Sequence, residues 1–284
     1  REGVVELPDG RSVGYADFGE SGHTAVLWCH GGPGSRMEAQ WIAPAAAEAG
    51  FRIVGIDRPG YGLSTPQPGR TIGGWPAEGL AVADRIGAER FLVVGCSTGG
   101  AYALALAAAA PERVRGAIAC CALTDMRWAE GKAMMAGAGT ADLWAAPDRE
   151  TALRIATDVF GADGTKMLSQ VDGAPLPPSD LALFQDPASL AGFVAGLRPM
   201  FAHGPQGYAD DRIADGPGWG TFDVSAVRCP VIVLHGELDS IVPVAHAHHT
   251  ASLVPGAKLE VVPELGHFSI MGAVLPALAA LAPR

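Results

Sequence analysis

Three side chains that can act as nucleophiles stand next to one another in the segment GCSTG (residues 95–99), between an apolar run and an alanine-rich one. Gly-x-Ser-x-Gly at the junction of a strand and a helix is typical of a tight turn that lifts one side chain above a sheet. Such a turn crowds the positions two before and two after the nucleophile. Only Ser97 has glycine at both positions, whereas Cys96 and Thr98 do not. The sequence therefore predicts Ser97 as the nucleophile.

A serine hydroxyl is a weak nucleophile until a histidine accepts its proton and a carboxylate orients that histidine. In this topology the partners follow the serine in the order acid, then histidine. Asp239 comes shortly after the apolar run CPVIVLHG, and we predict it as the acid, with Asp125 and Glu237 as the alternatives. His267 follows the last apolar run and a glycine, and we predict it as the base.

Attack on a carbonyl also needs hydrogen-bond donors for the oxyanion, each worth about 3 kcal/mol in a water-poor site. The backbone N–H of Thr98 is one predicted donor. We assign the other to Gly32 in the glycine-rich loop WCHGGPGS (28–35), with Gly31 as the alternative. Glycines in such a loop let a substrate approach the backbone closely.

The other histidines show no metal-binding pattern. His246, His248 and His249 in AHAHHT lack both an H-x-x-x-H spacing and a carboxylate partner, so we expect a solvated helix face. His30 and His235 are expected to form structural hydrogen bonds. We therefore expect neither a metal nor a cofactor.

Buried strands must position these residues, and six continuous apolar runs are candidates for them. Continuous rather than alternating hydrophobicity is typical of strands covered on both faces, as in a parallel sheet between helices. Two alternating runs around Asp9-Gly10 predict an antiparallel hairpin at one edge. The pattern as a whole predicts an α/β fold. The six runs are TAVLWCHGG (24–32), FRIVGID (51–57), RFLVVG (90–95), VRGAIACCAL (114–123), CPVIVLHG (229–236) and AKLEVVPE (257–264).

The strand pattern stops after the fourth run and resumes at the fifth. We predict a core in two parts, residues 1–123 and 223–284, with a helical cap inserted at 124–222. One cap helix is expected to begin at Asp186, a capping residue followed by proline. Large apolar side chains of the insert are expected either to line a substrate pocket or to form the core of the cap; they are Trp128, Met134, Met135, Trp144, Phe193, Met200, Phe201 and Trp219.

The composition excludes some partners. With 20 basic and 30 acidic residues the net charge is −10, which disfavours nucleic acid and anionic membranes. The longest apolar runs, Ala101–Ala110 and Ala273–Ala282, are shorter than the roughly 20 residues that span a bilayer. Five cysteines without paired spacing, and no visible signal peptide after Arg1, favour free thiols and a cytoplasmic location. The oligomeric state stays open.

Five segments together resemble the α/β-hydrolase superfamily in their order and spacing. The resemblance covers essentially the whole chain except the insert. It implies a mostly parallel eight-stranded sheet with helices on both faces, a cap over the active site, and the triad Ser97, Asp239 and His267. The segments are HGGPG (30–34), DRPGYGLS (57–64), GCSTGG (95–100), HGELDSIVP (235–243) and GHF (266–268).

The HGGPG loop also resembles that of proline iminopeptidases, but two features differ. Those enzymes usually carry Trp directly after the nucleophile, where this chain has Thr98, and D-x-R-G-x-G-x-S in place of DRPGYGLS. Aminopeptidase activity is therefore a minor option. Haloalkane dehalogenases and epoxide hydrolases of the superfamily use an aspartate nucleophile, so Ser97 argues against both.

The leading hypothesis is a serine hydrolase that cleaves a small-molecule carboxylic ester or lactone through an acyl-enzyme on Ser97. One alternative is other triad chemistry on the same scaffold, namely carbon–carbon bond hydrolysis, cofactor-free perhydrolysis or amide cleavage. Another is a ligand-binding protein that retains the triad with slow turnover. The insert has no basic cluster that would indicate a strongly anionic ligand.

Overall fold

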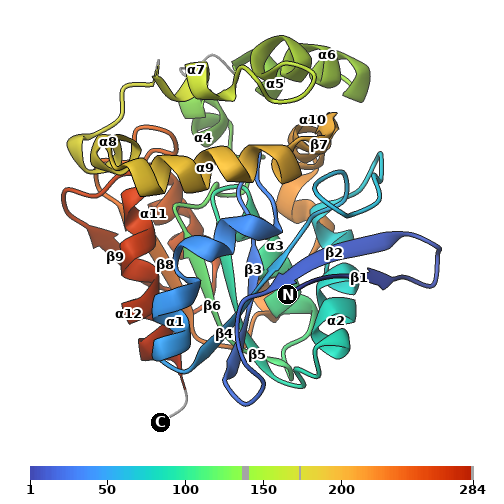
Figure 1. The fold of residues 1–284 in the computed structure, drawn as a ribbon, viewed down its shortest axis with the longest axis vertical. Helices are drawn as coiled ribbons and strands as arrows, with labels where there is room; N and C mark the ends of the chain where they lie inside the picture. The colour runs from blue at the N-terminus through green and yellow to red at the C-terminus, as the bar shows by residue number, and fades with distance from the viewer. Residues whose placement is uncertain (136–140, 173, 283–284) are drawn as a thin grey trace.

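A twisted sheet of eight strands forms the centre of the molecule (Figure 1). The computed structural model describes residues 1–135, 141–172 and 174–282. The strand order is β1-β2-β4-β3-β5-β6-β8-β9; β2 is antiparallel to both of its neighbours, and the remaining pairs are parallel. The predicted sheet and its edge hairpin are confirmed. The strands are β1 (Glu2–Glu6), β2 (Ser12–Asp17), β3 (Thr24–Cys29), β4 (Phe51–Ile56), β5 (Phe91–Cys96), β6 (Val114–Cys120), β8 (Val231–Gly236) and β9 (Lys258–Val262).

Helices cover both faces of this sheet and explain the continuous apolar runs. Leu27 and Val93 join the core on one face, while Val26 and Leu92 join the core on the other. Both orientations of successive strand residues are therefore buried, as in parallel sheets between helices. One face is covered by α2 (Pro76–Arg85), α3 (Gly99–Ala109) and α11 (Ala245–Leu253), and the other by α1 (Ala43–Glu48) and α12 (Val274–Leu281).

Between β6 and β8 the chain forms a layer of helices above the sheet (Figure 1). As predicted, Asp186 caps one of them, and its side chain accepts a hydrogen bond from Ser189 N at 2.8 Å. The division of the chain into core and cap at residues 123 and 223 stays a prediction, and residues 136–140, 173 and 283–284 lie outside the described part. The elements are α4 (Ala129–Met134), α5 (Ala141–Trp144), α6 (Arg149–Phe160), α7 (Met167–Asp172), α8 (Pro178–Gln185), α9 (Pro187–Met200), the short strand β7 (Ala202–Pro205) and α10 (Gln206–Ala214).

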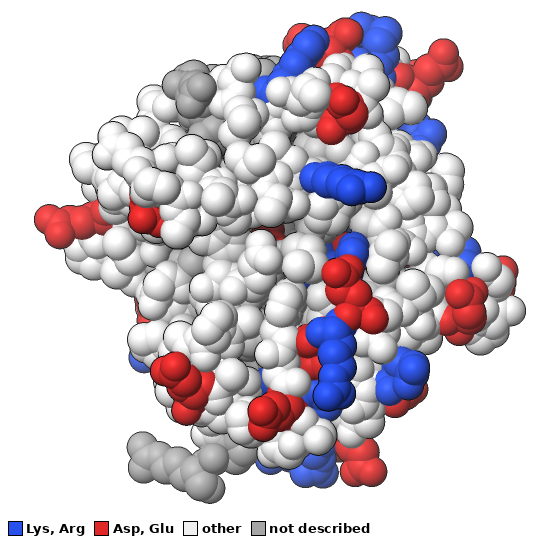
Figure 2. Space-filling model, viewed as in Figure 1, with Lys and Arg blue, Asp and Glu red and all other residues white. Residues whose placement is uncertain are grey.

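Several short 3-10 helices connect these elements. They are η1 (Arg36–Trp41), η2 (Ile72–Gly74), η4 (Gly218–Thr221), η5 (Val224–Ala226) and η6 (Ser269–Ala273). Among the described helices, none is long and apolar enough to cross a membrane. On the face shown in Figure 2, acidic and basic side chains are interspersed, so this face has no basic patch of the kind that binds a phosphate backbone.

The expectation of a solvated histidine face on α11 is wrong for two of the three histidines. His246 is fully buried, and its Nε2 donates to Gly131 O at 3.1 Å. The ring of His249 is half-buried and stacks on Trp128, with centroids 4.2 Å apart. Only His248 of the three is exposed. The reason is that α11 lies between β8 and the first turns of the insert, so one helix face must be buried whatever its residue types.

Candidate active site

Ser97 occupies the turn between β5 and α3 with a positive φ of 52°. This backbone region is unfavourable for serine, so the surroundings must hold it there. Ser97 N donates to Cys120 O at 2.9 Å, and Ser97 O accepts from Leu123 N at 3.2 Å. A Cβ at Gly95 would lie 2.2 Å from Gly99 O, and one at Gly99 would lie 2.1 Å from a carbonyl oxygen of β3. Both positions therefore require glycine.

His267 and Asp239 form a hydrogen-bonded pair at the ends of β9 and β8. His267 Nδ1 donates to Asp239 Oδ2 at 2.8 Å. The other carboxylate oxygen accepts from Ile241 N at 2.9 Å and from Val242 N at 2.8 Å. His235 Nε2 donates to Val242 O at 2.8 Å and lies 3.3 Å from Asp239 Oδ2. The carboxylate is thus fixed on both sides and orients the His267 ring, which leaves His267 Nε2 as the nitrogen able to accept a proton.

The pKa values of this pair move in opposite directions. Burial alone raises the pKa of Asp239, but the charge of His267, the close contact with His235 and the hydrogen bond from His267 hold it well below its usual range. Burial lowers the pKa of His267, but the charge of Asp239 and the hydrogen bond to Asp239 outweigh this and raise it above its usual range. The site therefore stabilises an imidazolium beside a carboxylate, which is the state that a histidine base reaches after accepting a serine proton.

Ser97 lies where two cavities meet. The first chamber, of about 210 Å³, contains Ser97 and His267 in its wall. The second chamber, of about 160 Å³, also contains Ser97 and extends toward α10. Gly32 and Phe268 border both. The other walls of the first chamber are mainly apolar side chains from η1, α9 and η6, including Met37, Trp41, Phe193, Met200 and Met271.

The apolar residues of the insert divide between these chambers and internal packing. Phe193 and Met200 line the first chamber, and Met135 and Trp144 line the second. The other four lie elsewhere: Phe201 in a cluster of the insert, Trp219 in the main core, Trp128 against His249, and Met134 exposed at the surface.

The predicted oxyanion donors border Ser97. Gly32 and Thr98 both line the second chamber. Gly31 N–H is already engaged, because it donates to Glu38 Oε2 at 2.9 Å. Within the described part of the chain, the N–H groups of Gly32 and Thr98 form no hydrogen bond. Of the two candidate glycines, Gly32 is therefore the one with an unoccupied amide.

Glu38 is a functional candidate that sequence reasoning missed. It lines the first chamber, and its other oxygen accepts from Trp28 Nε1 at 2.9 Å. Burial raises the pKa of this carboxyl to about 7, although both hydrogen bonds oppose the shift. The sequence feature that could have identified Glu38 is its position directly after the glycine-rich loop, in the 3-10 helix η1.

Asp180 of α8 holds the loop that carries His267. Its Oδ1 accepts from Phe268 N at 3.2 Å, from Ser269 N at 2.8 Å and from Ser269 Oγ at 2.6 Å. A Cβ at Gly266 would lie 2.4 Å from Asp180 Oδ2, so the loop passes directly over this carboxylate. No sequence pattern identified Asp180, because it lies in the insert far from the residues it contacts.

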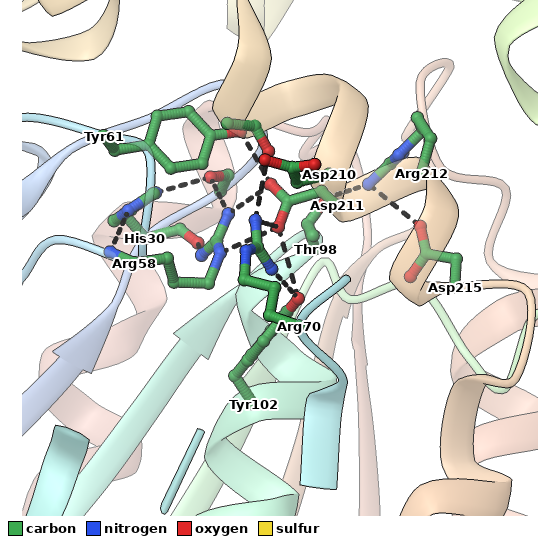
Figure 3. A network of polar contacts seen from close by, with 12 residues as sticks. His30, Arg58, Tyr61, Arg70, Thr98, Tyr102, Asp210, Asp211, Arg212 and Asp215 are labelled. Carbon is green, nitrogen blue, oxygen red and sulfur yellow. Dashed lines mark hydrogen bonds and ion pairs between the residues drawn. The ribbon is translucent and has the colours of Figure 1, made fainter. Parts of the chain in front are cut away.

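A buried cluster of charged and polar side chains surrounds Asp211 of α10 (Figure 3). Asp211 pairs with Arg58 at 2.9 Å and with Arg70 at 2.7 Å, and accepts from Tyr61 Oη at 2.6 Å. All four side chains are buried. Burial raises the pKa of Asp211, but the charges of Arg58 and Arg70 outweigh this and hold it far below its usual range. The carboxylate is therefore permanently ionised.

Arg212, the next residue of α10, brings a cation into the second chamber. It donates to Thr98 Oγ1 at 2.8 Å and pairs with Asp215 at 3.1 Å. Its guanidinium carbon lies 4.0 Å from the ring centroid of Trp144. Arg212 Nε and Trp144 Nε1 are buried donors without a partner among the described residues. The sequence of the insert has no basic cluster, so sequence analysis did not predict a buried arginine at this position.

The alternative acids lie elsewhere. Asp125 forms an ion pair with Arg127 at 2.6 Å and accepts from Trp219 N at 3.3 Å. Glu237 is exposed. Of the three candidate acids, Asp239 is the one that contacts His267. Within the described residues, no three His, Cys, Asp or Glu side chains are grouped as metal ligands.

Comparisons with known proteins agree with this architecture. Residues 24–274 match the family model described as alpha/beta hydrolase fold. A 2-hydroxymuconate semialdehyde hydrolase from Pseudomonas putida is 27% identical over 266 residues, which cover 93% of this chain and 86% of that protein. A non-heme haloperoxidase from Rhodococcus erythropolis is 25% identical over 271 residues, covering 93% and 92%. A solved esterase from Thermogutta terrifontis shares the fold with a TM-score of 0.72 and 21% identity, covering 99% of this chain and 97% of that one.

The family match spans most of the chain, and the fold and the relatives support a hydrolase that acts on a small molecule. On these grounds the chain belongs to the α/β-hydrolase fold family.

Proposed function

We propose that the protein is a serine hydrolase that cleaves a carboxylic ester or lactone through an acyl-enzyme on Ser97. The observation that carries this proposal is the 2.8 Å hydrogen bond between His267 and Asp239 beside a pocket that also contains Ser97. The strained backbone at Ser97 adds support, because such strain is concentrated at functional sites.

In the proposed reaction, Ser97 Oγ attacks the carbonyl carbon while His267 Nε2 accepts its proton. Asp239 stabilises the resulting imidazolium, and the N–H groups of Gly32 and Thr98 stabilise the oxyanion. His267 then donates the proton to the alcohol oxygen as the ester bond breaks. In the second half, water loses a proton to His267 and attacks the acyl-enzyme. As the bond between the acyl carbon and Ser97 Oγ breaks, His267 returns that proton to Ser97 Oγ and the acid is released.

We expect each of the two chambers that Ser97 lines to hold a different group of the substrate. The apolar walls of the first chamber fit a hydrocarbon group, and the second chamber is lined in part by the cationic side chain of Arg212. Chain-length preference in a screen of esters and lactones, graded separately by acyl and alcohol size, would assign one group to each chamber.

A fluorophosphonate probe tests the nucleophile directly. Intact mass should show one adduct per chain in the wild type and none in Ser97→Ala, and 4-nitrophenyl butyrate turnover should fall by several orders of magnitude. Ser252→Ala, a substitution at the exposed Ser252 of α11, is the control and should still be labelled. Labelling of Ser97→Ala, or turnover near the wild-type rate, would contradict the proposal. Turnover that stops near one equivalent would instead favour the ligand-binding alternative.

A second candidate, carbon–carbon bond hydrolysis, is favoured by one observation. Arg212 and Trp144 line the second chamber together with Ser97, and the Arg212 cation fits a substrate with an acidic or keto oxygen there. The P. putida relative carries the name of such a hydrolase. Turnover of 2-hydroxy-6-oxo-2,4-heptadienoate faster than that of simple esters, lost in Arg212→Met, would favour this reaction. If the wild type and Arg212→Met prefer simple esters to this substrate by the same factor, carbon–carbon bond hydrolysis is excluded.

A further inference from the structure

We infer that Arg58, held by Asp211, is a positioning residue that orients the peptide group between Gly31 and Gly32. This peptide supplies the Gly32 N–H, so the inference rests on the proposed function. It assigns a positioning role to two members of the buried cluster in Figure 3, Arg58 and Asp211, which the proposed reaction does not otherwise use.

The carbonyl oxygen of Gly31 is held by two donors. Arg58 Nη2 donates to it at 2.7 Å, and His30 Nδ1 lies 2.6 Å away. Because Arg58 N–H donates to His30 Nε2 at 3.1 Å, the proton of the neutral ring is on Nδ1, which donates to Gly31 O. Burial and the charge of Arg58 lower the pKa of His30 well below its usual range, so the ring stays neutral.

The orientation of Gly31 O determines the direction of Gly32 N–H. Both groups belong to one planar peptide unit, so they cannot rotate independently. Two consecutive glycines leave this unit free to rotate unless contacts fix it. Glu38 fixes the preceding unit through Gly31 N–H at 2.9 Å, and Arg58 fixes the unit that carries the proposed oxyanion donor.

Arg58 is itself fixed by contacts that only a guanidinium can make. Its Nε and Nη2 donate to the two oxygens of Asp211 at 3.1 and 2.9 Å, while Nη1 donates to His30 O. The guanidinium carbon lies 5.3 Å from the ring centroid of Tyr61 and 4.8 Å from that of Tyr102. A lysine would keep the charge but cannot bind the carboxylate and both carbonyls together.

Arg70 provides a matched control. It pairs with the same carboxylate at 2.7 Å, and its side chain is 3% exposed against 0% for Arg58. Its other contacts are Tyr102 Oη at 2.5 Å and Gly207 O at 3.0 Å, so it does not contact the glycine-rich loop. Arg70→Lys therefore repeats the chemical change of Arg58→Lys at the same ion pair without loosening the loop.

The experiment compares Arg58→Lys with Arg70→Lys, using 4-nitrophenyl butyrate as substrate and phenylboronic acid as inhibitor. Phenylboronic acid forms a tetrahedral adduct with a serine nucleophile and so reports on the oxyanion site. Arg58→Lys should lower kcat about 10- to 100-fold and weaken the inhibitor by a similar factor, with KM nearly unchanged. Arg70→Lys should keep kcat and inhibitor affinity within about threefold, although both variants lose thermal stability.

Equal losses of kcat in the two variants, or a folded Arg58→Lys with wild-type kcat and inhibitor affinity, would overturn the inference. Should Arg58→Lys not fold, Arg58→Met provides the same test, because Arg70 still neutralises Asp211. Ser97→Ala separates the two proposals. If it retains turnover, the proposed function fails. If turnover depends on Ser97 but not on Arg58, only the positioning role fails.

Discussion

Two buried aspartates, Asp239 and Asp211, differ in one property of their partners. Asp239 is paired with His267, whose charge changes when it gains or loses a proton. Asp211 is paired with Arg58 and Arg70, whose guanidinium groups stay charged throughout the physiological pH range. The pair that can exchange a proton suits chemistry, and the pair that cannot suits permanent positioning.

The largest expected effect is that of Asp239→Asn on turnover. An asparagine leaves His267 in the wrong tautomer and without a stabilising charge, so we expect kcat to fall about 10⁴-fold. Initial rates with 4-nitrophenyl butyrate measure this fall. Asp125→Asn is the control, since Asp125 contacts Arg127 and not His267, and it should stay within about threefold of the wild type. A comparable loss in Asp125→Asn would show that the acid is wrongly assigned.

In Asp211→Asn we expect the larger effect on stability and the smaller effect on turnover, the opposite of Asp239→Asn. Asp211→Asn leaves two buried guanidinium groups without their carboxylate, which costs about 3 to 5 kcal/mol of unfolding free energy. Its turnover should fall less than that of Asp239→Asn. Urea unfolding measures the stability, with Asp84→Asn as control because the Asp84–Arg113 pair is largely exposed. If both variants unfold at the same urea concentration, the buried pair contributes no more than the surface pair.

The pH dependence of stability should also differ between the two pairs. The pKa of His267 is raised, so its pairing stabilises the fold fully below pH 6.5 and is lost as pH rises into the alkaline range. The pKa of Asp211 is lowered, so its contribution is present above pH 3.8 and is lost only in more acid solution. Across the alkaline range, the unfolding free energies of wild type and His267→Gln should converge. Those of wild type and Asp211→Asn should stay separated; convergence there would contradict a permanent ion pair.

The smallest expected effect is that of Cys96→Ala. This variant tests whether Ser97, and not the neighbouring Cys96, is the nucleophile that transfers its proton to His267. Cys96 is 4% exposed, and its Sγ lies 3.6 Å from Met271 Sδ. Alanine removes this packing but no proposed reacting atom, so kcat should stay within about threefold while stability falls by about 1 kcal/mol. Turnover and urea unfolding are measured together. A loss of turnover close to that of Ser97→Ala would make the thiol a participant.

The sheet could be predicted from the sequence because six of its strands are short apolar runs and the edge hairpin has an alternating pattern, and the proposed triad residues lie shortly after such runs. Ser97 and His267 are examples, since glycine and apolar neighbours mark both locally. Asp180 and Asp211 could not be predicted in this way, because their partners lie in segments distant in the sequence. The error at His246 has a related cause: polar residue types indicated a solvated face, but the packing of α11 decided the burial.

The contacts of Asp180 and Asp211 have a consequence for protein engineering. Asp180 belongs to α8 and holds the loop of His267, while Asp211 belongs to α10 and reaches the glycine-rich loop through Arg58. A chimera that receives its inserted helices from a relative would lose both supports unless the donor segment carries equivalent carboxylates. Exchange of substrate preference by grafting this segment therefore requires the transfer of two buried anchors as well as the chamber walls.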